Sequence, residues 1–210
     1  MLGIATDPRS RRILQQFATG RGLLKSATVR EWVVFVVLVA LGVLGRWAFE
    51  DVPNFTPTVG IAVFAGLYFS RPALAALAPI AVMVVSNIGL QSYGSWAMLA
   101  VVYGSLLFPV MLSRVLGKTD GDRRRLRPLG MLACGMLPSA FFFATTNFAV
   151  WLGGGIYART LSGLSECYLR AIPFYPASLV GDLVFVGAAI LTYEAILHFS
   201  HTEQSVAVEN

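Results

Sequence analysis

The sequence predicts an all-α, polytopic membrane protein built from six transmembrane helices. Of its 210 residues, 56% are hydrophobic and only 13% are charged, whereas soluble domains carry about 25% charged residues. This shortage of charge is expected of lipid-facing helices, on which charged side chains are costly. Six apolar stretches also approach the length of about 20 residues that a spanning helix needs. Together these observations predict a small helical bundle.

The six predicted spans are mostly apolar and are joined in most cases by short links: residues 32–49, 55–69, 72–90, 96–116, 129–150 and 177–199. The second is short and starts at a turn between two prolines. The third begins with Pro72 in its first turn, where a missing N–H is tolerated. The predicted organisation is therefore a basic N-terminal segment (1–30), a six-helix transmembrane domain (31–199) and a C-terminal tail (200–210).

The basic residues indicate the orientation. With six spans, both termini and the even-numbered loops share one side, which holds thirteen Lys and Arg, against three on the other side: Arg46, Arg159 and Arg170. By the positive-inside rule the termini are cytoplasmic. We expect a multi-pass protein of the bacterial inner membrane whose first partner is the lipid bilayer. The net charge of +5 does not predict nucleic-acid binding, because the basic residues cluster in short loops.

The N-terminal region does not read as a cleaved signal peptide. About thirty residues precede the first span, and Arg46 stands where small cleavage residues belong. Within that region, residues 11–24 mix basic and apolar side chains. They would form either a helix on the anionic inner leaflet or a disordered basic tail.

A short amphipathic helix is predicted between spans five and six. Gly153, Gly154 and Gly155 would end span five, and residues 160–172 have two faces. One face is apolar: Leu161, Leu164, Tyr168, Leu169, Ala171 and Ile172. The other carries Ser162, Gly163, Glu166 and Arg170. Because this helix is too short to span, we expect it to lie on the outer surface or cap the bundle, with Glu166 and Arg170 as a solvated i,i+4 pair.

Five polar residues form the candidate binding set, here called the polar set. Each lies at or near the outer end of a predicted span: Arg46, Asn54, Asn87, Asn147 and Asp182. Asp182 shares one face of its helix with Phe185, Val186, Ala189 and Tyr193. Such a carboxylate should face the bundle interior or water.

Each member of the polar set also has a structural interpretation. Asp182 would be a ligand or counter-ion group, or a carboxylate favoured by the positive end of a helix dipole. Arg46 would bind a ligand, snorkel beside Trp47, or pair with Asp182. The asparagines would cap helix ends or, with the nearby aromatics Trp47, Tyr93, Trp96 and Trp151, line a cup for a small polar or aromatic solute.

No motif indicates catalysis. The sequence contains no Walker-type glycine loop, no zinc-protease histidine pair and no GxSxG serine elbow. His198 and His201 are interpreted as an exposed terminal pair, and Cys134 as a packing residue, with no positive reason for a disulfide to Cys167. We therefore expect no enzyme activity, no cofactor and no metal. Ala62–Gly66 and Ala100–Gly104 have the small-xxx-small spacing of close helix contacts.

The chain resembles an uncharacterised family of small bacterial integral membrane proteins. The resemblance extends over about residues 45–190 and rests on PNFTP at 53–57, VFAG at 63–66, TNFAVWL at 146–152, TLSGL at 160–164, Cys167-Tyr168, Ile172-Pro173-Phe174 and Gly181-Asp182-Leu183. In architecture it is similar to the substrate-binding S components of energy-coupling-factor vitamin transporters. That likeness implies six helices and an outward-facing pocket capped by loops. Many S components dock through an alanine pattern in the first helix, whereas span one has Ala40 and Ala48 without an AxxxA step.

The leading hypothesis is a substrate-capture or transport component whose site is lined by the polar set, with residues 153–172 as a lid. Since the sequence has no ATPase motif, active transport would need a separate energising module. The alternative is a structural or assembly subunit of a larger membrane complex, in which the polar residues tie helix ends together. A membrane enzyme is a third hypothesis, for which we find no catalytic groups.

Overall fold

The structure, a computed structural model, describes residues 29–90, 95–120, 123–153 and 155–209. The chain divides into two compact units, Met1–Val37 and Leu38–Asn210. Three sequence predictions lie outside the described part: the surface helix at 11–24, Tyr93 and the side chain of His201. In the first unit the described residues begin the helix Val29–Ala48, and all features discussed below belong to the second unit.

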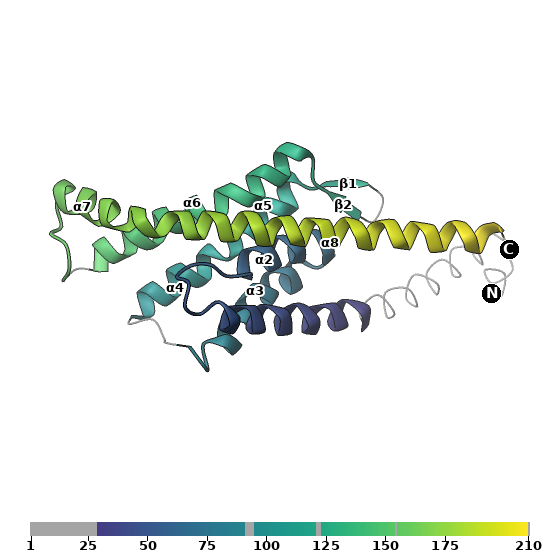
Figure 1. Cartoon of the computed structure of the whole chain (residues 1–210), viewed down its shortest axis with the longest axis horizontal. Helices are drawn as coiled ribbons and strands as arrows, with labels where there is room; N and C mark the ends of the chain where they lie inside the picture. The colour runs from purple at the N-terminus through teal and green to yellow at the C-terminus, as the bar shows by residue number, and fades with distance from the viewer. Residues whose placement is uncertain (1–28, 91–94, 121–122, 154, 210) are drawn as a thin grey trace, which may run out of the picture. The chain divides into compact units, whose positions relative to one another are not determined.

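The second unit is helical except for one short hairpin (Figure 1). After the helix Val29–Ala48, its elements follow in this order: α2 (Thr58–Tyr68), α3 (Pro72–Ser86), α4 (Trp96–Ser105), α5 (Leu107–Leu116), β1 (Lys118–Asp120), β2 (Arg123–Arg125), α6 (Pro128–Gly153), α7 (Leu161–Ala171), the 3₁₀ turn η1 (Ile172–Phe174) and α8 (Tyr175–Glu209). The predicted all-α class is confirmed, as are a helix at 161–171 and the end of α6 at the glycines.

Four helical stretches of the described chain are long and apolar enough to cross a membrane: Val29–Ala48, Trp96–Leu116, Pro128–Gly153 and Leu161–Phe199. The second and third predicted spans are shorter than expected. α2 has 11 residues and α3 has 15, which correspond to about 16 Å and about 22 Å of helix.

The fourth predicted span is interrupted at Leu106, which separates α4 from α5. The cause is Pro109, three residues further on. A proline within a helix cannot donate to the carbonyl four residues earlier and clashes with it, and here that carbonyl belongs to Ser105. The break brings Val102 and Leu106 together with Met83 of α3 in one buried apolar cluster.

The second unit is built around α2. Nine of its eleven residues are buried, as expected of a helix that is apolar on every side. α2 contacts α3, α5 and α8. A Cβ on Gly60 would lie 2.5 Å from the carbonyl oxygen of Phe185 in α8, and one on Gly66 would lie 2.7 Å from that of Val110 in α5. These glycines therefore allow the backbones of α2, α5 and α8 to approach closely.

The two predicted small-residue pairs behave differently. Ala62 is fully buried, and Gly66 lies against α5, so this pair forms a close helix contact inside the unit. A Cβ on Gly104 would meet no described atom within 4 Å. Within the described chain, Gly104 of the second pair therefore makes no close helix contact.

Arg114 holds the C-terminal end of α2. Its Nη1 donates to the Phe69 carbonyl at 2.8 Å, and its Nη2 donates to the Ser70 carbonyl at 3.2 Å. A cation at this end also interacts favourably with the helix dipole. Arg124 in turn donates from Nη1 to the Arg114 carbonyl at 3.0 Å. Some of the basic residues that set the predicted orientation thus also have structural contacts.

The hairpin β1–β2 was not predicted. Its strands are antiparallel, with Lys118 opposite Arg125. Its backbone is tied to α8, because the Arg124 N–H donates to the Tyr193 hydroxyl at 3.3 Å. Arg125 lies 3.7 Å from Glu194 of the same helix. The hairpin therefore closes one end of the bundle between α5 and α8.

We expect Gly60→Ala to destabilise the protein by about 1–3 kcal/mol, because the new methyl group would overlap the α8 backbone. Gly104→Ala is the matched control and should be neutral or stabilising by about 0.5–1 kcal/mol, since it adds helix propensity in open space. Unfolding in mixed micelles at increasing SDS would measure both. Equal stability of the two variants would contradict the close α2–α8 approach.

Candidate functional site

Asp182 is a buried carboxylate of the second unit. It is 5% exposed and follows the buried Gly181, beside which Phe55 packs. α8 begins at Tyr175, so Asp182 lies about two turns inside the helix rather than in its first turn. Because the helix dipole acts mainly within the first turn, the helix-start interpretation loses its support. The buried Val186 and Tyr193 continue the same face, as predicted.

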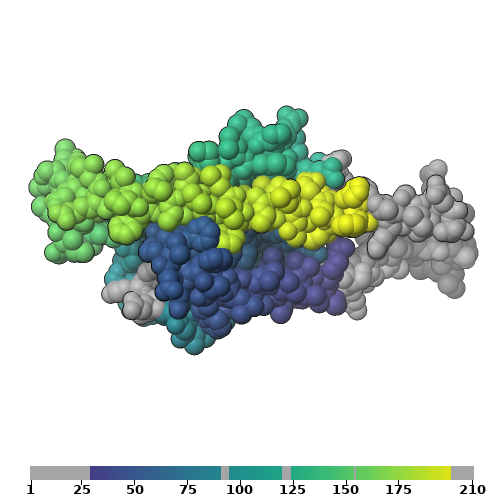
Figure 2. All heavy atoms as spheres, viewed as in Figure 1, coloured from purple at the N-terminus to yellow at the C-terminus, as the bar shows by residue number. Residues whose placement is uncertain are grey.

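Asn54 lies in the turn that precedes α2. Asn54 has φ +62°, in the left-handed region, which Asn adopts more readily than most residues. The next residue anchors the turn, because the ring of Phe55 packs on Phe49 at 5.1 Å and on Phe185 at 5.2 Å between centroids. In the space-filling view, the chain near residue 50 (blue) lies directly against α8 (green) (Figure 2). Thr56 then meets Thr58, with their hydroxyl oxygens 3.0 Å apart.

Arg46 is held by α3 rather than by Asp182. Its Nη1 donates to the sulfur of Met83 at 2.7 Å, and its Nη2 donates to Asn87 Oδ1 at 3.2 Å. Asn87 is itself oriented, since its Nδ2 donates to the Tyr103 hydroxyl at 3.3 Å. The helix that carries Arg46 approaches the start of α2 closely, because Gly45 faces Pro57. A Cβ on Gly45 would lie 2.6 Å from the proline ring.

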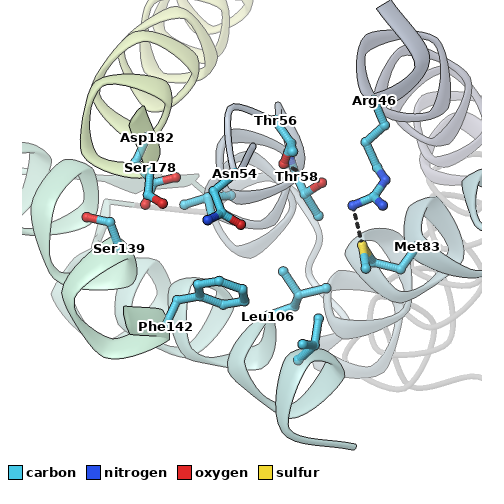
Figure 3. Close-up of a pocket in the computed structure, with 12 residues that line it drawn as sticks. Arg46, Asn54, Thr56, Thr58, Met83, Leu106, Ser139, Phe142, Ser178 and Asp182 are labelled. Carbon is cyan, nitrogen blue, oxygen red and sulfur yellow. Dashed lines mark hydrogen bonds between the residues drawn. The ribbon is translucent and has the colours of Figure 1, made fainter. Parts of the chain in front are cut away.

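A cavity of about 80 Å³ connects these residues and is here called the central cavity (Figure 3). Polar side chains line part of it: Arg46, Asn54, Thr56, Thr58, Ser139, Ser178 and Asp182. The remainder is mainly the apolar cluster described above, with Phe142 of α6 packed against it. Figure 3 shows Asp182, Ser178 and Ser139 together on one side, Arg46 with Met83 on the other, and Asn54 between them.

Arg46 and Asp182 line the same cavity but form no ion pair with each other in the described structure. Each also has one buried atom for which the described residues provide no hydrogen-bond partner: Nε of Arg46 and Oδ2 of Asp182. Buried charged groups without partners are unfavourable and uncommon in proteins. The two side chains of the predicted pair are therefore separate, and each has one buried polar atom without a partner among the described residues.

Two further cavities adjoin the central one at Asn54, which lines all three. The outer cavity, about 460 Å³, also borders Arg46, Glu50 and Asp51. The side cavity, about 240 Å³, borders Asn147, Ser178 and the end of α7 with η1. Of the polar set, Arg46, Asn54 and Asp182 thus share the central cavity, Asn87 supports Arg46, and Asn147 lies in the side cavity.

Asn147 is partly committed to its own helix, because its Nδ2 donates to the Phe143 carbonyl at 2.8 Å. The tryptophans of the predicted cup line none of these three cavities. Trp47 donates to the Ser86 carbonyl at 3.2 Å and Trp151 to the Ala158 carbonyl at 3.0 Å, while Trp96 is 87% exposed. These roles fit helix-end anchors and an interfacial belt better than a cup.

Sequence reasoning missed four hydroxyl residues of the central cavity, Thr56 and the buried Thr58, Ser139 and Ser178. Ser178 precedes Asp182 by four residues, a spacing that puts both on one helix face, so it was detectable. Ser139 follows Pro138 in α6, and its hydroxyl donates to the Met136 carbonyl at 2.9 Å. Serines that bond to their own helix are common, and nothing in the sequence distinguishes this one.

The structure shows which residues of α7 pack on the rest of the unit. The buried residues are Gly163 and Cys167, whereas Leu161 is 83% and Leu169 65% exposed. Small residues allow the close contact: a Cβ on Gly163 would overlap the Ala158 backbone, and the Cys167 thiol donates to the Asn147 carbonyl at 3.4 Å. The predicted pair of exposed Glu166 and Arg170 is confirmed, at 2.8 Å. The Thr160 hydroxyl also caps the helix by accepting from the Gly163 N–H, which was not predicted.

The described residues include no group of three or more His, Cys, Asp or Glu side chains arranged to hold a metal ion. Cys134 and Cys167 are both buried free thiols. The central cavity can instead offer a carboxylate oxygen, a guanidinium N–H and several hydroxyl and amide groups. This chemistry suits the reversible binding of a small polar molecule.

Residues 26–205 match the model of a protein family described as a family of unknown function (DUF6580). No curated protein and no solved structure matches the chain.

We expect Asp182→Asn to raise the free energy of unfolding of the ligand-free protein by about 1 kcal/mol or more, because it removes a buried, incompletely paired charge. Glu194→Gln is the control on the same helix. It breaks only a partly exposed ion pair, which is worth at most about 1 kcal/mol. SDS unfolding would measure both, and marked destabilisation by Asp182→Asn would show that the carboxylate is a structural tie.

Proposed function

Because the chain belongs to the DUF6580 family of unknown function, we propose its function from the site: a substrate-capture or transport component that binds a small solute in the central cavity. The observation that carries this proposal is the pair of unsatisfied charged atoms on one cavity, Asp182 Oδ2 and Arg46 Nε. A purely structural polar network would be expected to satisfy its members. Incompletely satisfied groups that line a cavity instead suit a site completed by a ligand.

We place the protein in the bacterial inner membrane, with six crossings and both termini in the cytoplasm. The four long helical stretches supply four crossings. The remaining two crossings would be α2 and α3, and the contacts of Arg114 near the end of α5 support them. Because Arg114 bonds to Phe69 and Ser70, the α2–α3 turn lies level with the basic hairpin. α2 is short, but it is buried among α3, α5 and α8 and need not face lipid along a full span.

The position of the site does not depend on whether α2 and α3 cross the membrane. If α2 and α3 formed a re-entrant hairpin instead, four crossings would remain and the termini would still share a side. The polar set would keep its place at the opposite, outward end. Only Arg71 leaves the loops on the terminal side in the second arrangement, so at least twelve of the sixteen Lys and Arg residues stay there and favour an outward-facing site.

The segment from Gly153 to Ile172 would act as the lid. α7 is attached to the outer end of α6, where the Tyr168 hydroxyl donates to the Ala144 carbonyl at 2.6 Å. Ala171, near the end of this segment, and Phe174, just after it, line the side cavity next to Asn147. A movable α7 would therefore control access from the side cavity to Ser178 and Asn54.

An S-component-like mode of action fits this arrangement: capture from outside, with energy supplied by a separate membrane module. The sequence provides no nucleotide-binding motif for self-powered transport, and its first helix lacks the AxxxA step through which many S components dock. The ligand would be a small solute, since binding cavities for drug-sized molecules measure about 300–1,000 Å³ and the central cavity about 80 Å³.

A second candidate is a structural or assembly subunit of a larger membrane complex. The open space at Gly104, on the exposed side of α4, favours it, because small residues on a free helix face allow another helix to approach. Purification under native conditions separates the two. Stoichiometric recovery with a non-transport complex, without a solute, would favour the second candidate.

We expect a solute from a panel of vitamins and nucleobase-like compounds to raise the melting temperature of the purified protein by several degrees, as binding to the native state does. Asp182→Ala should abolish this shift, and Glu194→Gln should retain it. Full binding of an identified solute by both Asp182→Ala and Asn147→Ala would refute the site assignment.

A further inference from the structure

We infer that the solute of the central cavity is dipolar: a cationic or strongly donating group meets Asp182, and an anionic or strongly accepting group meets Arg46. This inference rests on the proposed function and names its ligand class. It starts from the two charges that line one cavity without pairing to each other. If Arg46 and Asp182 formed an ion pair with each other, the cavity would have no net preference for a charged ligand.

The Asp182 end of the cavity requires a donor. The side chain is 95% buried, and Oδ2 has no partner among the described residues. Ser178 and Ser139 lie beside it (Figure 3), and the Ser139 hydroxyl is already used as a donor within α6. An ammonium or amidinium group would supply the missing donor and the missing positive charge together.

The Arg46 end requires an acceptor. Within the described chain its guanidinium bonds only to a methionine sulfur and an amide oxygen, and sulfur is a weak acceptor. No described carboxylate lies within ion-pair distance of Arg46. A ligand carboxylate would provide the accepting oxygens that Arg binds best, and Asn87 holds the guanidinium in place to receive it.

One wall between the two ends is apolar, and Asn54, Thr56 and Thr58 line the cavity on the other side. The apolar wall consists of Met83, Val102, Leu106 and Phe142, and the first three are almost fully buried. A ligand with a short apolar middle would pack on this wall while its charged ends reach Asp182 and Arg46. An amino-acid-like molecule with separated amine and acid groups fits both ends and this wall, whereas an inorganic cation or anion fits only one end.

The test uses matched compounds and isothermal titration of the full-length protein in nanodiscs. The dipolar probes are glycine, β-alanine, 4-aminobutyrate and 6-aminohexanoate, which differ in charge separation. The single-charge controls are butylamine, butyrate and sodium chloride. We expect one dipolar probe to bind at least tenfold more tightly than either organic control. Asp182→Asn should reduce its affinity to that of the acid, and Arg46→Gln should reduce it to that of the amine.

Glu194→Gln, which removes a carboxylate about three turns beyond Asp182 in α8, should leave binding unchanged, and melting curves show whether each variant is folded. The inference is overturned if butylamine, butyrate or sodium binds as tightly as every dipolar probe, or if no dipolar probe binds while a panel solute does. That last result leaves the proposed function intact. Absence of binding by all probes and all panel solutes would reject both.

Discussion

The contact of α2 with α8 at Gly60 is the constraint on which the rest of the site depends. Gly60 meets the Phe185 carbonyl in α8, and Phe185 lies one turn from Asp182. The same α2 begins with Thr58 and is preceded by the turn that carries Asn54. A larger residue at 60 would separate the helices and widen the space between Asp182 and Thr58. Close backbone packing through small residues, the main means of helix association in membranes, thus also positions the polar groups.

Arg46 and Asp182 lie at separate ends of the cavity because different neighbouring residues hold each of them. Arg46 is positioned by Met83 and Asn87 of the α3 end, and Asp182 by the packing of α8 on α2. The core cluster of Met83, Val102 and Leu106 fills the space beneath them. Two oppositely charged groups that are fixed independently cannot collapse onto each other, so part of each remains available. Such preorganisation lowers the cost of binding a ligand.

Much of the fold could be predicted from the sequence because lipid imposes simple rules. Hydropathy located the helices, Gly153–Gly155 marked the end of α6, and 3.6-residue periodicity located α7. The hairpin at 118–125 escaped prediction, since its charged residues lack the alternation that signals a strand. The face by which α7 packs on the protein could not be predicted either. Helical projection sorts residues by polarity, but contact with a neighbouring helix selected Gly163 and Cys167 for their size.

The site was predictable in part. Charged and amide residues at one end of the spans are rare in membrane helices, so Arg46, Asn54 and Asp182 could be found from sequence. Whether Arg46 and Asp182 form an ion pair could not be predicted from the sequence. The answer depends on which other acceptors lie near Arg46, and only the fold determines these. The most direct measurement is native mass spectrometry of the protein after incubation with a small-molecule extract of its host cells. One bound solute per chain, lost in Asp182→Ala and kept in Glu194→Gln, is the predicted result. An identical adduct in Asp182→Ala, or a stoichiometric protein partner with no solute, would contradict the central claim.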